Sequence, residues 1–256
     1  MSSANPIRHV SDTALWVAVY RAQESERAEA VFHDPYARKL AGDRGMQIAA
    51  AMPFAQRHSW SYIARTWLVD QVIEREVQQG TDTVINLAAG LDSRPYRMQL
   101  PASLRWIEVD LPDMLNYKQE VLAAERPVCA VERVPLDLRD TAERRALFHR
   151  LGGEVKRALM VSEGLIVYFE ADGAAQFFAA YGWKVVETRS LLQTAAKLKR
   201  LSFGMRLLSL LPDPAGRKRS LRVGEQRASA HRLARRFSKR GESRGHLPEA
   251  DSERCL

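Results

Sequence analysis

The sequence predicts an α/β fold built on an open, mostly parallel sheet. From residue 83 to residue 161, short runs of branched apolar residues alternate with stretches of helical periodicity, which is typical of βαβ units. The first run, Thr83–Leu87, leads into the turn Ala88-Ala89-Gly90, and a carboxylate follows two residues later. A glycine turn between a strand and a helix is typical of the ligand-binding edge of such a sheet.

Length and composition favour one folded domain. The chain has 256 residues, of which 46% are hydrophobic, enough for a single large α/β core. Met1 to Val10 lack the apolar core of a signal peptide, and no stretch approaches the length of a membrane span. Only Cys129 and Cys255 are present, which supports neither a disulfide framework nor a metal site. We therefore expect a cytoplasmic protein without a metal.

The positive charge is concentrated at the end of the chain. Residues 217–256 hold 12 Lys/Arg and 5 Asp/Glu, whereas the rest holds 27 and 26, out of totals of 39 and 31. A basic patch on the folded body is therefore not indicated, and nucleic-acid binding is disfavoured except through the tail. We expect a helical cap in residues 1–60, a core in residues 61–211 and a basic, disordered tail in residues 212–256.

The N-terminal part is predicted to be helical. Ser11-Asp12-Thr13 can cap a helix through residues 14–20, and His33-Asp34-Pro35-Tyr36 is predicted to form a turn. A short helix is expected to end at Gly42. Residues 61–79 form the clearest amphipathic helix, which Gly80 stops.

The remaining elements follow from alternating patterns. Asp113 suits the first turn of a helix over residues 111–125, and Asp140 with Glu143 resembles a capping box that opens a helix to about Leu151. The predicted strands are residues 83–87, 104–109, 131–138 and 159–161, the last with an exit over 165–169. Further along, a brief helix is expected at 176–180, a strand at 183–188 and a Leu-rich helix at 191–211.

The turn after the first strand points to a nucleoside. It has one glycine where a pyrophosphate site of the G-x-G-x-x-G type has three. The second strand ends in the acids Glu108 and Asp110, and an acid at that place commonly binds ribose hydroxyls. A cofactor with ribose and adenine but no phosphates, such as S-adenosylmethionine, suits this turn. The plain alternative is an ordinary strand–turn–helix of an α/β core.

Eight motifs in order resemble one family. They are Ser11-Asp12-Thr13-Ala14, Arg21-Ala22-Gln23-Glu24-Ser25, His33-Asp34-Pro35-Tyr36, Arg65-Thr66, the segment Leu87–Arg94, Glu108-Val109-Asp110-Leu111-Pro112, Asp137-Leu138-Arg139-Asp140 and the segment Ser162–Tyr168. Together they resemble the leucine carboxyl methyltransferase-related family, in particular its bacterial S-adenosylmethionine-dependent branch, over residues 8–211. The resemblance implies a Rossmann-like class I methyltransferase fold.

The resemblance also implies roles for six residues. Arg65 would bind the methionine carboxylate, Gly90 would let the cofactor approach the turn, and Asp110 would bind the ribose. Asp137 and Leu138 would contact the adenine end, and Glu163 would contact the cofactor after the fourth strand. We expect Glu108 to point to the other face of the sheet and so to be the weaker ribose ligand.

The roles of three other polar residues in these motifs are left open. Arg21 is a candidate for a further basic contact from the cap. For Asp92 and Arg94, an ion pair that stabilises the turn is as good an interpretation as direct contact with the cofactor. No catalytic base is assigned, because a carboxylate acceptor needs none.

The C-terminal half departs from the family pattern. The family has roughly fifty more residues between the Glu163 motif and the Phe177-Phe178 motif, so part of the acceptor region is expected to be missing. The sequence thus predicts an S-adenosylmethionine-dependent methyltransferase that acts on oxygen of a small molecule or carboxylate. Alternatives are a cofactor binder without turnover, an NAD(P)-dependent oxidoreductase, and a protein that binds nucleic acid through its tail.

Overall fold

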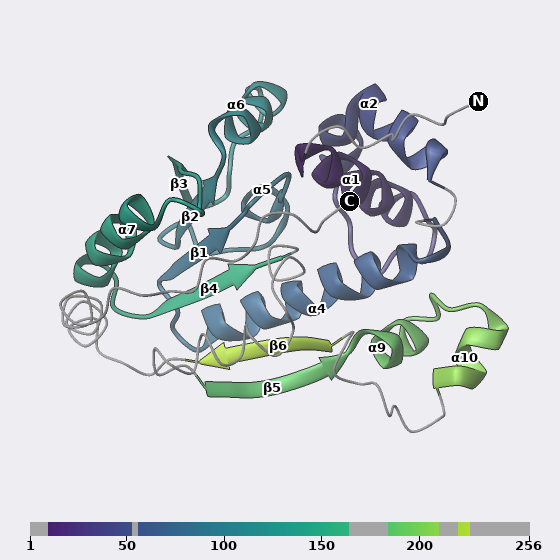
Figure 1. Ribbon diagram of the computed structural model, residues 1–256. Coiled ribbons are helices and arrows are strands. Elements are labelled where there is room, and N and C mark those ends of the chain that lie inside the picture. The colour runs from purple at the N-terminus through teal and green to yellow at the C-terminus, as the bar shows by residue number, and fades with distance from the viewer. Residues whose placement is uncertain (1–9, 53–55, 164–183, 210–219, 226–256) are drawn as a thin grey trace, which may run out of the picture.

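A four-stranded parallel sheet forms the centre of the molecule (Figure 1). The computed structural model describes residues 10–52, 56–163, 184–209 and 220–225. The strand order is β3-β2-β1-β4, and all three pairings are parallel. The strands are β1 (Thr83–Leu87), β2 (Arg105–Asp110), β3 (Ala130–Pro135) and β4 (Ala158–Ser162). The predicted open, parallel α/β sheet is confirmed.

Helices cover both faces of this sheet, and alternate strand residues pack against different helices. Val84 and Trp106 pack with Ile73 of the long helix α4 (Ser59–Gln78), while Ile85 packs with Leu147 of α7 (Thr141–Glu154) on the opposite face. Burial of both faces explains why β1 is buried at every position. The helices of this part are α1 (Val10–Ser25), α2 (Ala37–Ala51), α4 (Ser59–Gln78), α5 (Arg94–Arg97), α6 (Pro112–Val121) and α7 (Thr141–Glu154).

Local signals set several helix ends. The carboxylate of Asp140 accepts hydrogen bonds from the backbone N–H groups of Ala142 at 2.8 Å and Glu143 at 3.0 Å, which confirms the predicted start of α7. Gly80, with a φ of 93°, follows the last turn of α4 in a conformation that favours glycine. The strand β1 follows α4, and β4 follows α7, close to the positions that the sequence predicts.

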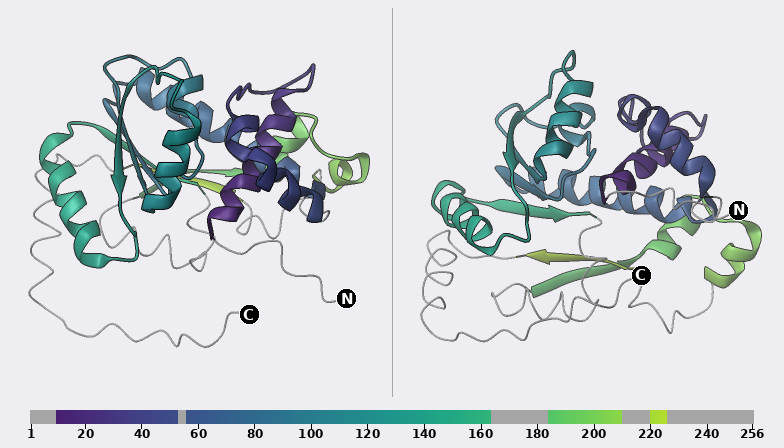
Figure 2. Two further views of the ribbon diagram at one scale, coloured as in Figure 1. Left: turned by 90° about the horizontal axis from the view of Figure 1, so that it is seen from above. Right: turned by 45° about the horizontal axis from the view of Figure 1, so that its top comes forward.

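The helices α1 and α2 form a cap beside one end of the sheet (Figure 2). Their apolar residues, including Ala18 and Leu40, pack with Leu91 after the glycine turn and with Met114 of α6. The predicted short helix does end at Gly42, whose φ of 55° and ψ of −175° are not helical. A second helical stretch follows directly and extends α2 to Ala51, so the glycine marks a sharp kink between two helical parts.

The C-terminal part differs from the sequence prediction in two ways. The helix expected over 191–211 is two helices, α9 (Leu191–Lys197) and α10 (Phe203–Ser209), separated where Lys199 has a φ of 56°. Within the tail expected to be disordered, β6 (Ser220–Glu225) pairs antiparallel with β5 (Lys184–Ser190). Backbone hydrogen bonds to β5 order a segment that has no apolar periodicity of its own. The exit over 165–169 and the helix at 176–180 lie outside the described residues.

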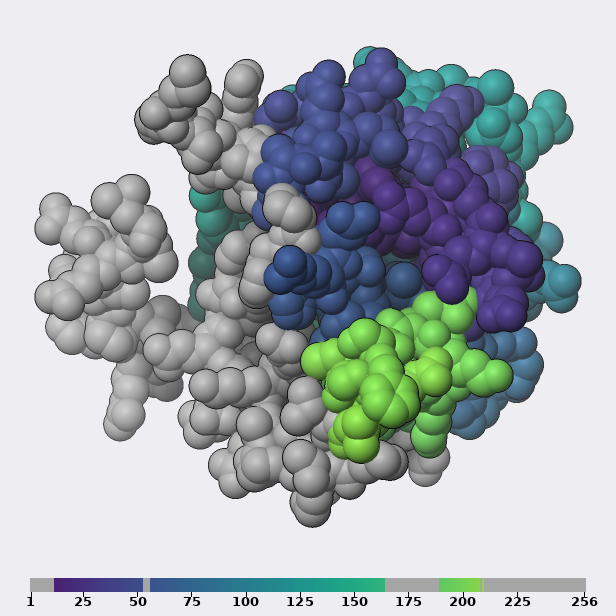
Figure 3. Space-filling view, turned by 90° about the vertical axis from the view of Figure 1, so that its right-hand side faces the viewer, coloured from purple at the N-terminus to yellow at the C-terminus, as the bar shows by residue number. Residues whose placement is uncertain are grey.

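The helices α9 and α10 lie against the N-terminal half (Figure 3). Ala195 of α9 packs against Trp60 and Ala64 of α4. The guanidinium of Arg200 donates to the buried carboxylate of Glu24 in α1, with the shortest contact at 2.7 Å. In the part of the chain that is described, no helix has both the length and the apolar character needed to cross a membrane.

Candidate functional site

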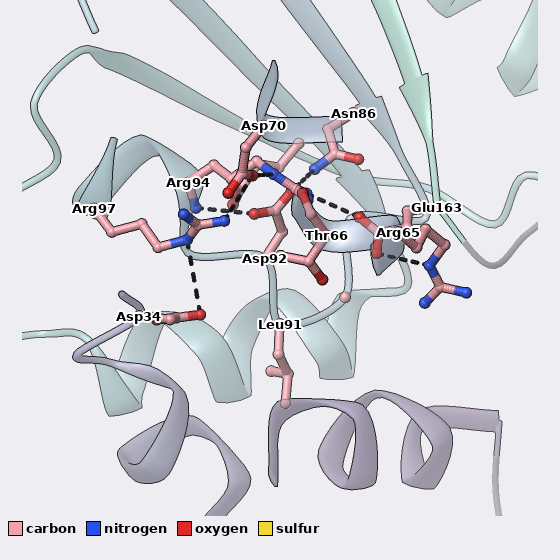
Figure 4. Close-up of polar contacts among 12 residues, drawn as sticks. Asp34, Arg65, Thr66, Asp70, Asn86, Leu91, Asp92, Arg94, Arg97 and Glu163 are labelled. Carbon is pink, nitrogen blue, oxygen red and sulfur yellow. Dashed lines mark hydrogen bonds and ion pairs between the residues drawn. The ribbon is translucent and has the colours of Figure 1, made fainter. Parts of the chain in front are cut away.

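Five of the six predicted site residues follow or lie at the carboxyl ends of the four parallel strands. Gly90 follows β1, Asp110 ends β2, Asp137 and Leu138 follow β3, and Glu163 follows β4. Because the sheet is parallel, these positions share one edge, in the spatial order β3, β2, β1, β4. Arg65, the sixth, projects from α4 toward the same edge (Figure 4).

The glycine turn and the acid of β2 contact each other directly. The carboxylate of Asp110 accepts the backbone N–H of Gly90 at 2.6 Å and that of Leu111 at 2.7 Å. Burial raises the pKa of Asp110 above its usual value, although the two backbone N–H groups act in the opposite direction. Each oxygen thus has one backbone donor, which leaves further lone pairs for a ligand.

The turn itself has an unusual backbone. Two residues of the turn have a positive φ: Gly90 with 50° and Ala88 with 52°. A positive φ costs a residue with a Cβ about 1–2 kcal/mol, so Ala88 is strained. Strain of this kind gathers at ligand sites, where surrounding contacts hold it in place. A Cβ at Gly90 would contact the Cβ of Ala14 in the cap at 3.5 Å.

Arg65 and Glu163 form an ion pair across the edge. The Nε of Arg65 donates to Oε1 of Glu163 at 2.9 Å, and both side chains are partly exposed. The guanidinium also lies over the ring of Tyr62, 5.3 Å from its centroid. Within the described residues, Arg65 donates only through Nε, so the edge formed by its two terminal nitrogens has no acceptor among these residues. That edge suits bidentate binding of a carboxylate.

A second arginine holds the same glutamate from the inside (Figure 4). Arg94, only 3% exposed, donates through Nη1 to Oε2 of Glu163 at 2.9 Å and to Asp92 at 2.7 Å. Burial disfavours ionised Glu163, but Arg94 and then Arg65 outweigh it and lower its pKa to about 2. Asp92 is likewise buried, and Arg94 leaves its pKa well below the usual range. The open interpretation of Asp92 and Arg94 as an ion pair is confirmed.

The network continues into the cap. Asp70 of α4 accepts from Nε of Arg94 at 2.6 Å and from Nη2 of Arg97 at 2.7 Å. Arg97 lies 3.9 Å from Asp34, which also accepts from Arg21 at 2.9 Å. Alternating arginines and acids therefore connect the cap to the glycine turn.

Arg21 also contacts the glycine turn directly. Its Nη2 donates to the carbonyl oxygen of Leu91 at 2.6 Å. The structure thus places Arg21 in contact with backbone next to Gly90. The sequence singled out Arg21 as a basic contact from the cap, but not its partners.

The residues after β3 are the least integrated part of the predicted site. Asp137 is half-buried and pairs with the exposed Arg139 at 2.6 Å. Hydrogen bonds from Arg139 lower the pKa of Asp137 to about 2. Leu138 packs against the cluster on the α7 face of the sheet. Their backbone is nevertheless tied to the site, since the N–H of Leu136 donates to the carbonyl of Asp110 at 2.9 Å.

Glu108 does not compete with Asp110 for a ligand. It is fully buried and pairs with Nζ of Lys118 at 2.6 Å and with Nε of Arg133 at 3.2 Å. The prediction that it points to the other face is wrong, because residues two apart on a strand share a face. Depth separates them instead: Glu108 lies inside β2 and Asp110 at its end.

Two residues of the network were missed in the sequence. Asp70 and Arg97 carry no motif, although an aspartate within the apolar stripe of α4 is a signal, since a buried carboxylate needs a partner. No group of three or more His, Cys, Asp or Glu residues that could hold a metal occurs among the described residues.

The chain matches a known family over most of its folded part. The family model for leucine carboxyl methyltransferase matches residues 14–181. A protein of Frankia alni is 34% identical over 181 residues, which are 66% of this chain and 63% of the relative. One of Streptomyces coelicolor is 34% identical over 180 residues, again 66% and 63%, and one of Mycobacteroides abscessus 34% over 189 residues, 66% and 59%.

These relatives carry the name "putative S-adenosyl-L-methionine-dependent methyltransferase". The chain spans less than two thirds of their length. The match includes the cap, the four parallel strands and the edge on which the predicted residues lie. The chain therefore belongs to the leucine carboxyl methyltransferase family.

Proposed function

We propose that the protein is an S-adenosylmethionine-dependent methyltransferase that methylates an oxygen of a small molecule or carboxylate. One observation carries the proposal furthest. Asp110 and Gly90 meet at the end of β2 and β1, and Arg65 and Glu163 meet beside them at the end of β4. The first pair offers groups for an adenosine and the second offers groups for an amino acid.

The second pair has the charges that the methionine end of the cofactor requires. The edge formed by the terminal nitrogens of Arg65 fits its carboxylate, and the lone pairs left on Glu163 fit its ammonium group. Asp110 keeps acceptor capacity for the two ribose hydroxyls, and Gly90 leaves room for close approach. Asp137 and Leu138 are proposed to contact the adenine at the end of β3.

Methyl transfer requires few further groups from the protein. The bound sulfonium supplies an already activated methyl group. The residues of the edge then orient the cofactor, and alignment with the acceptor provides most of the rate. A carboxylate acceptor is already an anion, so we assign no catalytic base. We infer that the enzyme acts in the cytoplasm, because two cysteines among 256 residues fit a reducing compartment.

An assay of S-adenosylhomocysteine release tests this function. Purified protein is incubated with S-adenosylmethionine and a panel of small carboxylates, phenols and alcohols. Acceptor-dependent release, with an ester or ether product found by mass spectrometry, is the expected result. Cofactor binding without release over the whole panel would favour a cofactor binder without turnover, the second candidate. That candidate is favoured by the short spacing between the Glu163 motif and Phe177-Phe178, where the family is expected to have roughly fifty more residues.

A further inference from the structure

Arg94 touches three of the five segments that carry the proposed cofactor contacts. In α4, the helix of Arg65, it donates to Asp70 at 2.6 Å and to the carbonyl of Thr66 at 3.3 Å. In the segment after Gly90 it donates to Asp92 at 2.7 Å. After β4 it donates to Glu163 at 2.9 Å (Figure 4).

We propose that Arg94 is a positioning residue for cofactor binding, which orients Glu163 and, through Glu163, the guanidinium of Arg65. The proposal rests on the function proposed above. It assigns to Arg94 no contact with the cofactor itself, because its side chain is 3% exposed and its Nε, Nη1 and Nη2 atoms are bonded to Asp70, Asp92, Glu163 and the carbonyl of Thr66.

The two arginines on Glu163 differ in how firmly they are held. Arg65 has a single hydrogen bond among the described residues and a side chain that is 20% exposed. Arg94 is buried and fixed by acceptors in three directions. A partly exposed arginine loses considerable rotamer entropy when it is ordered. The buried arginine therefore decides where the Glu163 carboxylate lies, and the carboxylate restricts Arg65 before a ligand arrives.

Only an arginine can serve these acceptors together. Its planar guanidinium offers donors in several fixed directions, whereas the ammonium of a lysine is one compact charge. Lysine at position 94 would keep the charge balance among Asp70, Asp92 and Glu163. It would lose the geometry that aims Glu163 at Arg65. The substitution thus separates orientation from charge.

Arg97 provides a matched control. It lies in the same short helix α5, its side chain is 5% exposed, and it shares the Oδ1 acceptor of Asp70. Among the described residues it makes no hydrogen bond or ion pair with Glu163 or Asp92. A loss of affinity caused by general damage to the buried network would follow from either arginine. A loss caused by misplaced Glu163 would follow from Arg94 alone.

The test compares S-adenosylhomocysteine binding by titration calorimetry for the unaltered protein, Arg94→Lys and Arg97→Lys, with folding checked by circular dichroism. A lost charged hydrogen bond corresponds to about a tenfold change or more. We expect at least about tenfold weaker binding for Arg94→Lys and a change within about threefold for Arg97→Lys. Equal effects of the two substitutions would overturn the positioning role.

A double substitution tests whether Arg94 acts through Glu163. If it does, adding Arg94→Lys to Glu163→Gln weakens binding little beyond Glu163→Gln alone. Additive losses would contradict the proposal. If Arg94→Lys does not fold, Asp92→Asn replaces it, since Asp92 anchors Arg94 but has no hydrogen bond to Glu163 or Arg65. Unchanged affinity in that folded variant would equally contradict it.

Titration of the unaltered protein distinguishes failure of the proposed function from failure of the Arg94 role. If the unaltered protein does not bind S-adenosylhomocysteine, the proposed function falls, and the role of Arg94 falls with it. If the unaltered protein binds but the two lysine variants bind alike, only the role of Arg94 falls.

Discussion

The carboxylate of Asp110 accepts the backbone N–H of Gly90 at 2.6 Å. The acid that ends β2 thus fixes the glycine turn that follows β1, and a single side chain links the two signals from which the cofactor hypothesis started. Its second oxygen accepts the N–H of Leu111 at 2.7 Å, so the carboxylate is oriented by its own backbone before any ligand binds. An oriented acceptor needs less ordering when a ribose arrives.

Replacing Asp110 should therefore weaken cofactor binding without unfolding the protein. Asp110→Ala removes the acceptor for the ribose hydroxyls and the bond to Gly90. Charged hydrogen bonds of this kind are worth about 1.5–3 kcal/mol, which corresponds to about tenfold or more in affinity for S-adenosylhomocysteine. The exposed neighbour Asp113 supplies the control Asp113→Ala, for which no change is expected. Equal affinities of the two folded variants would move the ribose contact elsewhere.

Relief of the strain at Ala88 should stabilise the fold. Ala88→Gly removes a Cβ from a residue with a φ of 52°, a gain of about 1–2 kcal/mol that is partly offset by the greater freedom of glycine in the unfolded chain. We expect a net increase of about 0.5–1 kcal/mol in the free energy of unfolding by urea. Ala89→Gly is the matched control: Ala89 is 5% exposed with an ordinary φ, and its replacement should destabilise. Destabilisation by both would show that the turn is unstrained.

The paired Glu163 should make stability depend on acidic pH. Its pKa falls from 4.5 to about 2 in the folded protein. A lowered carboxyl pKa stabilises the fold above the unfolded value, and this stability is lost as pH falls from about 4.5 toward 2. Asp92 acts in the same direction, whereas the raised pKa of Asp110 acts in the opposite one. Glu163→Gln should therefore lose less unfolding free energy between pH 5 and pH 3 than the unaltered protein; an identical loss would contradict the ion pairing.

Two truncations separate β6 from the rest of the basic tail. Removal of residues 226–256 leaves β6 in place, whereas removal of residues 217–256 deletes it and leaves β5 without this antiparallel partner. We expect the longer deletion to lower the thermal unfolding midpoint more than the shorter one. Cofactor affinity should stay unchanged in both, because every proposed contact precedes residue 164. Loss of affinity with the longer deletion alone would make β6 part of the cofactor site.

The sequence predicts the sheet well because burial of both faces favours short apolar stretches within the strands. Residues 83–87 are the clearest example, since strand and prediction coincide. It also predicts that Gly90 and Asp110 lie together, because the carboxyl ends of adjacent parallel strands lie side by side. The roles of Arg65 and Glu163 followed from the family resemblance, and their ion pair was not predicted. Pairing that depends on distant backbone is harder to foresee. Ser220–Glu225 shows no period of its own and becomes a strand only beside β5.

The charge network shows a second limit. Arg94 and Asp92 were visible in a motif, but Asp70 and Arg97 become partners only when α4 and α5 pack together. Sequence spacing places Asp70 on α4 and cannot show which arginine it meets. The geometric relation between Arg94, Glu163 and Arg65 therefore required the structure.

A calorimetric titration of the full chain with S-adenosylhomocysteine tests the central claim most directly. The complete edge formed by Arg65, Gly90, Asp110 and Glu163 predicts one site per chain with a dissociation constant of micromolar order, about −8 kcal/mol. NADH in the same titration should give no heat. Absence of heat and of any thermal shift with millimolar S-adenosylhomocysteine would contradict the account.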